Sequence, residues 1–181
     1  MRKINNNFVG IFGGSFDPPH KGHLIISRAS IKKLKLKNLY WIVTKKNPLK
    51  KKTLFSLNQR LRRCAAMIKS DKKIKLLFLE KKVKSSRTIK ILKYFIKKTP
   101  ESKFFLIIGS DNLINFTKWT EWKLIAKLCK LVVFSRKGFD LKAKKSVIVK
   151  YLDKKNIIYI KNKKINISST ELREKILNKI N

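Results

Sequence analysis

The sequence has little cysteine, little histidine, few acidic residues and no long apolar run. Its two cysteines, Cys64 and Cys129, stand far apart and neither belongs to a C-x-x-C pair, so the sequence indicates neither a disulfide framework nor a zinc site. No uninterrupted apolar run approaches the length of a membrane span. The first residues, MRKINNN, lack the apolar core of a secretory signal, and we therefore expect a cytoplasmic protein.

The shortage of acidic residues makes the chain strongly basic. The chain contains ten aspartates and glutamates and 47 lysines and arginines, which give a formal net charge of +37. A basic surface attracts polyanions, so nucleic-acid binding is one hypothesis. The lysines, however, are spread along the whole chain and show no localised stripe with stacking aromatics and no nucleic-acid reading motif. This distribution favours a general compositional bias, and we expect no specific nucleic-acid partner.

Length and hydrophobic pattern predict one α/β domain over residues 1–181. The chain has 181 residues, of which 43% are hydrophobic, enough for one well-cored domain. Segments with helical spacing, such as 24–34, 57–68 and 88–96, separate short apolar runs. This alternation predicts a doubly wound, Rossmann-like, mostly parallel sheet. The predicted strands are 8–12, 39–43, 74–79, 104–109, 130–135 and 157–160.

Both histidines of the chain lie in one stretch, GGSFDPPHKGHL at residues 13–24. It joins a predicted strand to a predicted helix through a glycine-rich turn. Glycines at Gly13 and Gly14 let a ligand approach the backbone, and a helix N-terminus favours phosphate. His20 and His23, three residues apart, would share one face of the first helical turn. The stretch predicts an anion site; the alternative is a structural turn with surface histidines.

The same stretch carries a family resemblance. The G-G-x-F-D-P and H-x-G-H patterns resemble the signature of the nucleotidylyltransferase superfamily, and the P-P-H version is similar to that of the bacterial nicotinate-nucleotide adenylyltransferases. The resemblance implies transfer of AMP from ATP to nicotinate mononucleotide, with release of pyrophosphate. It implies that His20 and His23 are the catalytic residues and donate hydrogen bonds to the ATP phosphates. No protein base is needed, since phosphate is an adequate nucleophile, and Mg²⁺ would be bound mainly through ATP and water.

A second block, KFFLIIGSDNL at residues 103–113, is a continuous apolar strand that runs into Gly-Ser-Asp. Ligands bind at the carboxyl edge of such strands. The resemblance implies that Gly109 lets nucleotide approach the backbone and that Asp111 accepts hydrogen bonds from ribose hydroxyls. The alternative is that Ser110 or Asp111 caps the next helix.

A third block, ISSTELR at residues 167–173, lies near the C-terminus. Ser168 and Glu171 fit a capping box that begins a helix. Ser169, Thr170 and Arg173 would gather at the same helix N-terminus as an anion site, and the resemblance implies that they hold the β and γ phosphates of ATP.

The remaining candidates complete two expected binding sites. Four further candidates each have a structural alternative: Lys50 as a solvated charge, Thr88 as a helix start, Trp119 as a core residue and Arg136 as a turn residue. The expected ATP site comprises Gly13, Gly14, Ser15, Phe16, His20, His23, Gly109, Asp111, Ser169, Thr170 and Arg173. The expected mononucleotide site comprises Ser15, Phe16, Lys50, Thr88, Trp119 and Arg136. The segment 57–68 reads as a scaffold helix, with Arg60, Arg62 and Arg63 on the side away from its apolar residues.

Three alternative functions stay open. The first is the same reaction with nicotinamide mononucleotide as acceptor. The second is transfer to another phosphorylated acceptor such as phosphopantetheine, although that family normally has threonine at the position of His20. The third, from another class, is a basic nucleic-acid-binding protein on the same fold.

Overall fold

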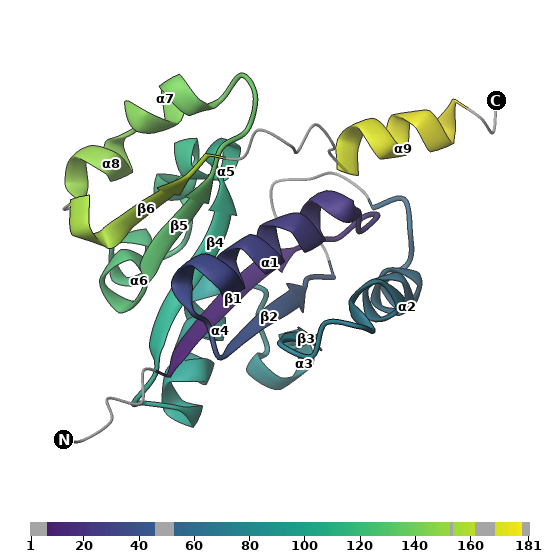
Figure 1. The fold of residues 1–181 in the computed structure, drawn as a ribbon, viewed down its shortest axis with the longest axis horizontal. Coiled ribbons are helices and arrows are strands. Elements are labelled where there is room, and N and C mark those ends of the chain that lie inside the picture. The colour runs from purple at the N-terminus through teal and green to yellow at the C-terminus, as the bar shows by residue number, and fades with distance from the viewer. Residues whose placement is uncertain (1–6, 46–52, 153, 162–168, 179–181) are drawn as a thin grey trace.

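A computed structural model describes residues 7–45, 53–152, 154–161 and 169–178 of the chain. They form a six-stranded sheet, parallel at every pairing, with the strand order β3-β2-β1-β4-β5-β6 (Figure 1). The expected doubly wound α/β architecture is confirmed. The strands are β1 (Phe8–Gly14), β2 (Asn38–Val43), β3 (Ile74–Leu77), β4 (Lys103–Gly109), β5 (Lys130–Phe134) and β6 (Ile157–Ile160).

The predicted end of the first strand was wrong. Gly13 and Gly14 were expected in the turn, but β1 continues through both, because they pair in register with Ile42 and Val43 of β2. The turn begins only at Ser15. There Phe16, and not a glycine, adopts the left-handed backbone conformation, with φ 47°.

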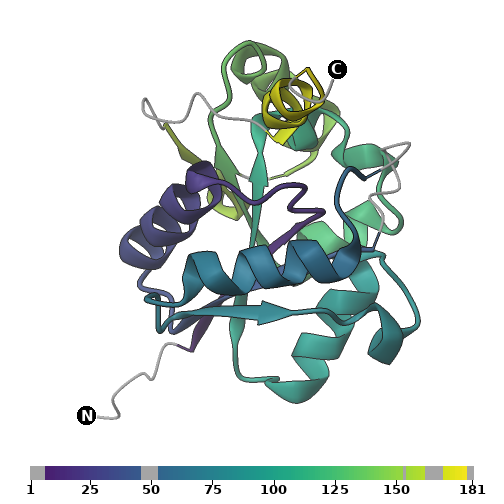
Figure 2. The ribbon, with the colours of Figure 1, turned by 90° about the vertical axis from the view of Figure 1, so that its right-hand side faces the viewer.

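Helices cover both faces of the sheet (Figure 2). Ser56 begins the second of them with a capping box: its hydroxyl accepts the N–H of Gln59, and its own N–H donates to Oε1 of Gln59. The helices are α1 (Lys21–Leu34), α2 (Leu57–Ile68), α3 (Glu80–Val83), α4 (Thr88–Lys98), α5 (Ser110–Ile114), α6 (Trp122–Leu128), α7 (Asp140–Lys144), α8 (Val147–Tyr151) and α9 (Ser169–Leu177), with 3₁₀ turns at Phe116–Lys118 and Lys154–Asn156.

Each face of the sheet has its own hydrophobic core, because successive side chains of a strand point to opposite faces. On β4, Phe104, Leu106 and Ile108 pack with α4, α5 and α6, whereas Phe105 and Ile107 pack on the side of α1 and α2. The helices of the described residues include none long and apolar enough to cross a membrane.

The chain reverses its winding direction beside β1. From β1 it proceeds outward to β2 and β3, and it then returns to place β4, β5 and β6 on the other side. The carboxyl ends of β1 and β4 therefore diverge into helices on different faces, which opens a crevice where ligands bind in such folds. The C-terminal helix α9, yellow in Figure 1, lies beside the β1–α1 loop at this edge.

The packing around β1 gives a matched pair of stability predictions. A Cβ at Gly10 would meet Leu36 Cδ1 at 2.7 Å and Ile107 Cδ1 at 3.1 Å, whereas a Cβ at Gly13 would meet nothing within 4 Å. We expect Gly10→Ala to lower the free energy of unfolding by about 1–3 kcal/mol, because the core must shift. Gly13→Ala should change it by less than about 0.5 kcal/mol. Urea unfolding of both variants checks this, and equal losses would contradict the packing described here.

Candidate active site

A cavity of about 790 Å³ opens at the carboxyl ends of β1, β4 and β5, and a smaller one of about 210 Å³ adjoins it. Phe12, Gly13, Gly14, Gly109 and Asn112 line both, so the ends of β1 and β4 form their common wall. Of the other predicted ATP residues, the larger cavity is lined by Ser15, Phe16, His20, His23, Asp111, Ser169 and Thr170. Blocks far apart in the sequence thus meet in one place.

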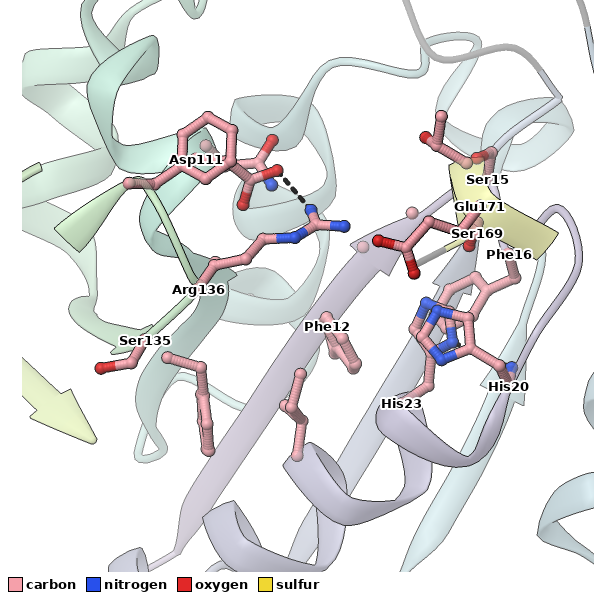
Figure 3. A pocket seen from close by; sticks show the side chains of 18 of the residues that line it. Phe12, Ser15, Phe16, His20, His23, Asp111, Ser135, Arg136, Ser169 and Glu171 are labelled. Carbon is pink, nitrogen blue, oxygen red and sulfur yellow. Dashed lines mark hydrogen bonds and ion pairs between the residues drawn. The ribbon is translucent and has the colours of Figure 1, made fainter. Parts of the chain in front are cut away.

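The two histidines form a compact pair at the start of α1, with ring centroids 3.9 Å apart (Figure 3). The backbone N–H of His20 donates to Nδ1 of His23 at 3.1 Å, and the backbone N–H of His23 donates to the carbonyl of His20 at 2.9 Å. Because Nδ1 of His23 accepts a hydrogen bond, a neutral His23 carries its proton on Nε2.

An aromatic stack supports His23 from behind. Its ring lies 4.8 Å from that of Phe16, and Phe16 stacks on Trp41 of β2 at 4.7 Å and 19°. Trp41 Nε1 donates to Ser27 Oγ at 2.7 Å, and the Ser27 hydroxyl donates to the carbonyl of His23 at 2.8 Å. Sequence reasoning placed Trp41 in a strand but missed this support, because the contact depends on the register between β1 and β2.

The surroundings of His20 keep it neutral. The pKa of His20 is lowered from 6.5 to about 4, first by burial and then by the charge of Arg136, while the charge of Glu171 opposes the shift. The carboxylate of Glu171 points into the cavity between the histidines and Arg136 (Figure 3). Nδ1 of His20 is buried and has no hydrogen-bond partner within the described residues. Near pH 7 this imidazole can therefore give a ligand one N–H without holding a positive charge.

Asp111 and Arg136 form an ion pair across the ends of β4 and β5, with Oδ2 and Nη1 2.6 Å apart (Figure 3). The backbone N–H of Arg136 donates to Ser110 Oγ at 3.0 Å and to Asp140 Oδ1 at 3.1 Å. Gly109 is at the N-cap of α5, which has no side-chain cap among the described residues, so the alternative of a Ser110 or Asp111 cap is wrong. A Cβ at Gly109 would meet Oδ1 of Asp111, so a larger residue there would require the Asp111 side chain to move.

The C-terminal block docks α9 on the histidine loop. Ser169 Oγ donates to the carbonyl of Pro18 at 3.1 Å, and Arg173 donates to the carbonyl of Asp17 at 2.8 Å and to Thr170 Oγ1 at 3.0 Å. Ser169 and Thr170 line the larger cavity, whereas Arg173 is behind them and ties the helix to the loop. Ser168, expected in a capping box, lies outside the described residues.

The smaller cavity contains only part of the expected mononucleotide site. Thr88 and Trp119 line it, and Trp119 packs at 5.1 Å from Phe116. Arg136, Ser15 and Phe16, also predicted for this ligand, line the larger cavity, and Lys50 lies outside the described residues. Sequence reasoning did not single out Thr44, Asn112 and Lys118, which line the smaller cavity.

Two buried charges beneath the loop were also missed. Arg60 was placed on the outer side of a scaffold helix, but it is 1% exposed and faces the loop. Asp17, also 1% exposed, accepts the N–H groups of Leu54 at 2.8 Å and Phe55 at 2.9 Å. Helical spacing distinguishes apolar from polar faces and cannot show that a polar face is buried against a loop.

Comparison with known proteins fits this geometry. A family model described as cytidylyltransferase-like matches residues 11–175. A probable nicotinate-nucleotide adenylyltransferase of Pelagibacter ubique is 44% identical over 180 residues, which cover 96% of this chain and 99% of that protein. The chain belongs to this adenylyltransferase family. A probable nicotinate-nucleotide adenylyltransferase of Agrobacterium fabrum is 40% identical over 74% of this chain and 71% of its own length.

Solved structures of the family share the fold. The nicotinic acid mononucleotide adenylyltransferase of Plasmodium falciparum, complexed with NaAD, superposes with a TM-score of 0.75 at 22% identity, over 93% of this chain and 83% of its own. A nicotinate-nucleotide adenylyltransferase structure from Vibrio parahaemolyticus gives a TM-score of 0.64 at 18% identity, over 96% of this chain and 88% of its own. The six-stranded parallel sheet is thus the family fold.

The environment of His20 predicts an unusual titration. Because the chain contains only two histidines, two imidazole signals report on the site by NMR. We expect the His20 signal, assigned through its loss in His20→Gln, to stay that of a neutral imidazole from pH 8 to about 5.5 and to titrate near the pKa of about 4. A His20 titration near 6.5 would contradict the buried geometry.

The same shift predicts the pH dependence of stability. In the unfolded chain His20 takes up its proton near pH 6.5, whereas the folded protein takes it up only near 4. The unfolded state therefore binds more protons between these values, so this residue's contribution to the free energy of unfolding falls as the pH is lowered through that window. Urea titrations at successive pH values measure how the free energy of unfolding changes with pH. His20→Gln should remove the part of that change that comes from His20.

Proposed function

We propose that this chain transfers AMP from ATP to nicotinate mononucleotide, which yields nicotinate adenine dinucleotide and pyrophosphate. The observation that carries the proposal is the pair of adjoining cavities, which share the ends of β1 and β4 as a wall beside the paired histidines. One cavity can hold each substrate, and the reacting phosphates would meet at the common wall. The names of the close relatives point to the same reaction.

The reaction needs positioning and charge stabilisation more than it needs a base. A phosphate oxygen of the mononucleotide attacks the α-phosphorus of ATP, a new P–O bond forms, and the bond to the departing pyrophosphate breaks. His20 and His23 would donate N–H groups to the phosphate oxygens, where negative charge increases as the reaction proceeds. Their mutual hydrogen bonds and aromatic support hold these donors in place beforehand.

Each substrate has a proposed set of contacts. ATP would lie in the larger cavity, with its phosphates between the histidines and the N-terminus of α9, where Ser169 and Thr170 lie. Asp111 would accept ribose hydroxyls once its pairing with Arg136 loosens, and Arg136 would then be free to bind phosphate of the mononucleotide. The pyridine ring would lie in the smaller cavity beside Thr88 and Trp119. Arg173 supports the phosphate site mainly by holding α9.

A divalent ion fits the larger cavity as a companion of ATP. Its wall carries two carboxylates, Asp111 and Glu171, and within the described ranges no three His, Cys, Asp or Glu side chains gather as a metal site. We propose that Mg²⁺ is held mainly by phosphate oxygens and water. Glu171 lies beside the proposed position of the ATP phosphates and would orient the water molecules bound to the ion. When bound, the ion would neutralise the triphosphate.

The histidines give the first functional prediction. We expect His20→Ala and His23→Ala each to lower the turnover rate by roughly a hundredfold or more, because each removes a preorganised donor to the reacting phosphates. Pyrophosphate release measures the rate. Ile25→Ala, a control on the same helix turn that lines neither cavity, should retain wild-type turnover. Near-normal activity in both histidine variants would refute the mechanism.

The smaller cavity gives a prediction about the acceptor. Two cations, Arg87 and Lys118, line it together with Thr88, whereas Lys90 does not line it. Cationic donors favour the carboxylate of nicotinate over the neutral amide of nicotinamide. We expect kcat/KM to be at least about tenfold higher for nicotinate mononucleotide, roughly 1.4 kcal/mol of transition-state binding.

The test is pyrophosphate release with each mononucleotide in turn. Arg87→Gln should reduce the ratio of kcat/KM for nicotinate mononucleotide to kcat/KM for nicotinamide mononucleotide. Lys90 is an exposed residue of α4 near Arg87, and Lys90→Gln should leave this ratio unchanged. Added salt should lower both rates together, since distant lysines act on the phosphate that both acceptors share. Equal efficiencies in the wild type would mean that no carboxylate site exists. Activity with phosphopantetheine, or nucleic-acid binding without adenylyl transfer, would favour the other functions.

A further inference from the structure

Arg60 on α2 is a fully buried arginine that takes no direct part in either cavity. Its side chain is 1% exposed and donates to four backbone carbonyl groups. Nε donates to Phe55 at 3.1 Å, Nη1 to Ser15 at 2.6 Å and Thr44 at 2.8 Å, and Nη2 to Lys45 at 2.8 Å. Burying a guanidinium costs free energy that only such partners offset.

The four carbonyls belong to three segments that meet at the edge of the sheet. Ser15 follows β1, Thr44 and Lys45 follow β2, and Phe55 precedes α2. A buried carbonyl without a donor is costly, and each of these lies outside the regular strand ladder that would otherwise supply one. The planar fork of an arginine reaches all of them at once, which the single ammonium of a lysine cannot do.

Nη1 connects the two substrate cavities. Ser15 lines the larger cavity and Thr44 the smaller, and the same nitrogen donates to both carbonyls. Thr44 is also held from the other side, since its N–H donates to the carbonyl of Gly14 at 3.0 Å. This guanidinium is therefore a second link between the two walls, beside the backbone hydrogen bond of Thr44 to Gly14.

We propose that Arg60 is a positioning residue for adenylyl transfer, which holds the wall of the ATP cavity at a fixed distance from the wall of the mononucleotide cavity. The inference rests on the proposed function. In a reaction catalysed mainly by proximity, a displacement of about 1 Å between substrates can cost on the order of a hundredfold in rate. Loss of Arg60 should therefore slow the chemical step more than it weakens the binding of either substrate alone.

The test compares Arg60→Lys and Arg60→Met with Ile68→Ala, a control that truncates a buried side chain of the same helix far from the loop. We expect the single-turnover rate with both substrates saturating to fall about tenfold to a hundredfold in the Arg60 variants. The Kd of ATP and of nicotinate mononucleotide, each titrated alone, should change less than about threefold. Ile68→Ala should lose stability but keep the wild-type single-turnover rate.

A second readout does not need activity. The imidazole signals of His20 and His23 should shift in the Arg60 variants, because the loop that leads into the start of α1 moves, and should stay in place in Ile68→Ala. Wild-type protein that releases no pyrophosphate with any acceptor would refute the proposed function, and unshifted signals in Arg60→Lys would then refute the positioning role as well.

Three results would overturn the positioning role while the proposed function stands. The first is an Arg60→Lys rate within about twofold of the wild type. The second is a rate loss no larger than that of Ile68→Ala at equal loss of stability. The third is failure of both Arg60 variants to fold even with saturating ATP, which stabilises the folded state by mass action, because Arg60 would then be a requirement of the fold itself.

Discussion

The site depends on the hydrogen bonds that the protein makes to the buried backbone between β1 and α1. This loop leaves the centre of the sheet, so its polar groups are buried where no neighbouring strand can pair with them. Arg60 donates to the carbonyl of Ser15 in this loop, and the carboxylate of Asp17 accepts the N–H groups of Leu54 and Phe55, just before α2. Arg173 then donates to the Asp17 carbonyl and brings α9 against the same loop. One loop thus determines where the histidines, the two cavities and the C-terminal helix lie.

The rigidity of this loop also controls the charge of the site. His20 is neutral because it is held in a partly buried place near Arg136, and a mobile histidine would move into water and regain an ordinary pKa. A neutral donor binds the triphosphate less tightly in the ground state than an imidazolium would, while it still stabilises the charge that develops during transfer. In the proposed mechanism the packing of Phe16 and Trp41 behind His23, the partner of His20, also contributes to catalysis, although neither aromatic ring carries a charge.

The sequence predicted the strands and the site blocks well because both leave local signals. Apolar runs located all six described strands, with the largest differences at β1, which continues to Gly14 beyond the predicted end at Phe12, and at β3, which ends at Leu77 and not at Leu79. The histidine, Gly-Ser-Asp and C-terminal blocks were predicted to meet, since each follows a strand or begins a helix at one sheet edge. Arg60 and the Asp111–Arg136 pair could not be predicted, because their partners are backbone groups or side chains far along the chain.

The extreme positive charge does not explain the selectivity of the site. The positive charges of the arginines at the larger cavity are balanced by carboxylates. Arg136, which lines the cavity, pairs with Asp111, and Arg173, behind the cavity wall, lies 3.9 Å from the carboxylate of Asp17. The surface lysines draw any phosphorylated ligand toward the protein, and salt screens them. Both candidate acceptors carry the same phosphate, so this field brings them in equally. A difference between them can arise only where their pyridine substituents contact the protein, which in the proposed binding mode is the small cavity lined by Arg87, Thr88 and Lys118.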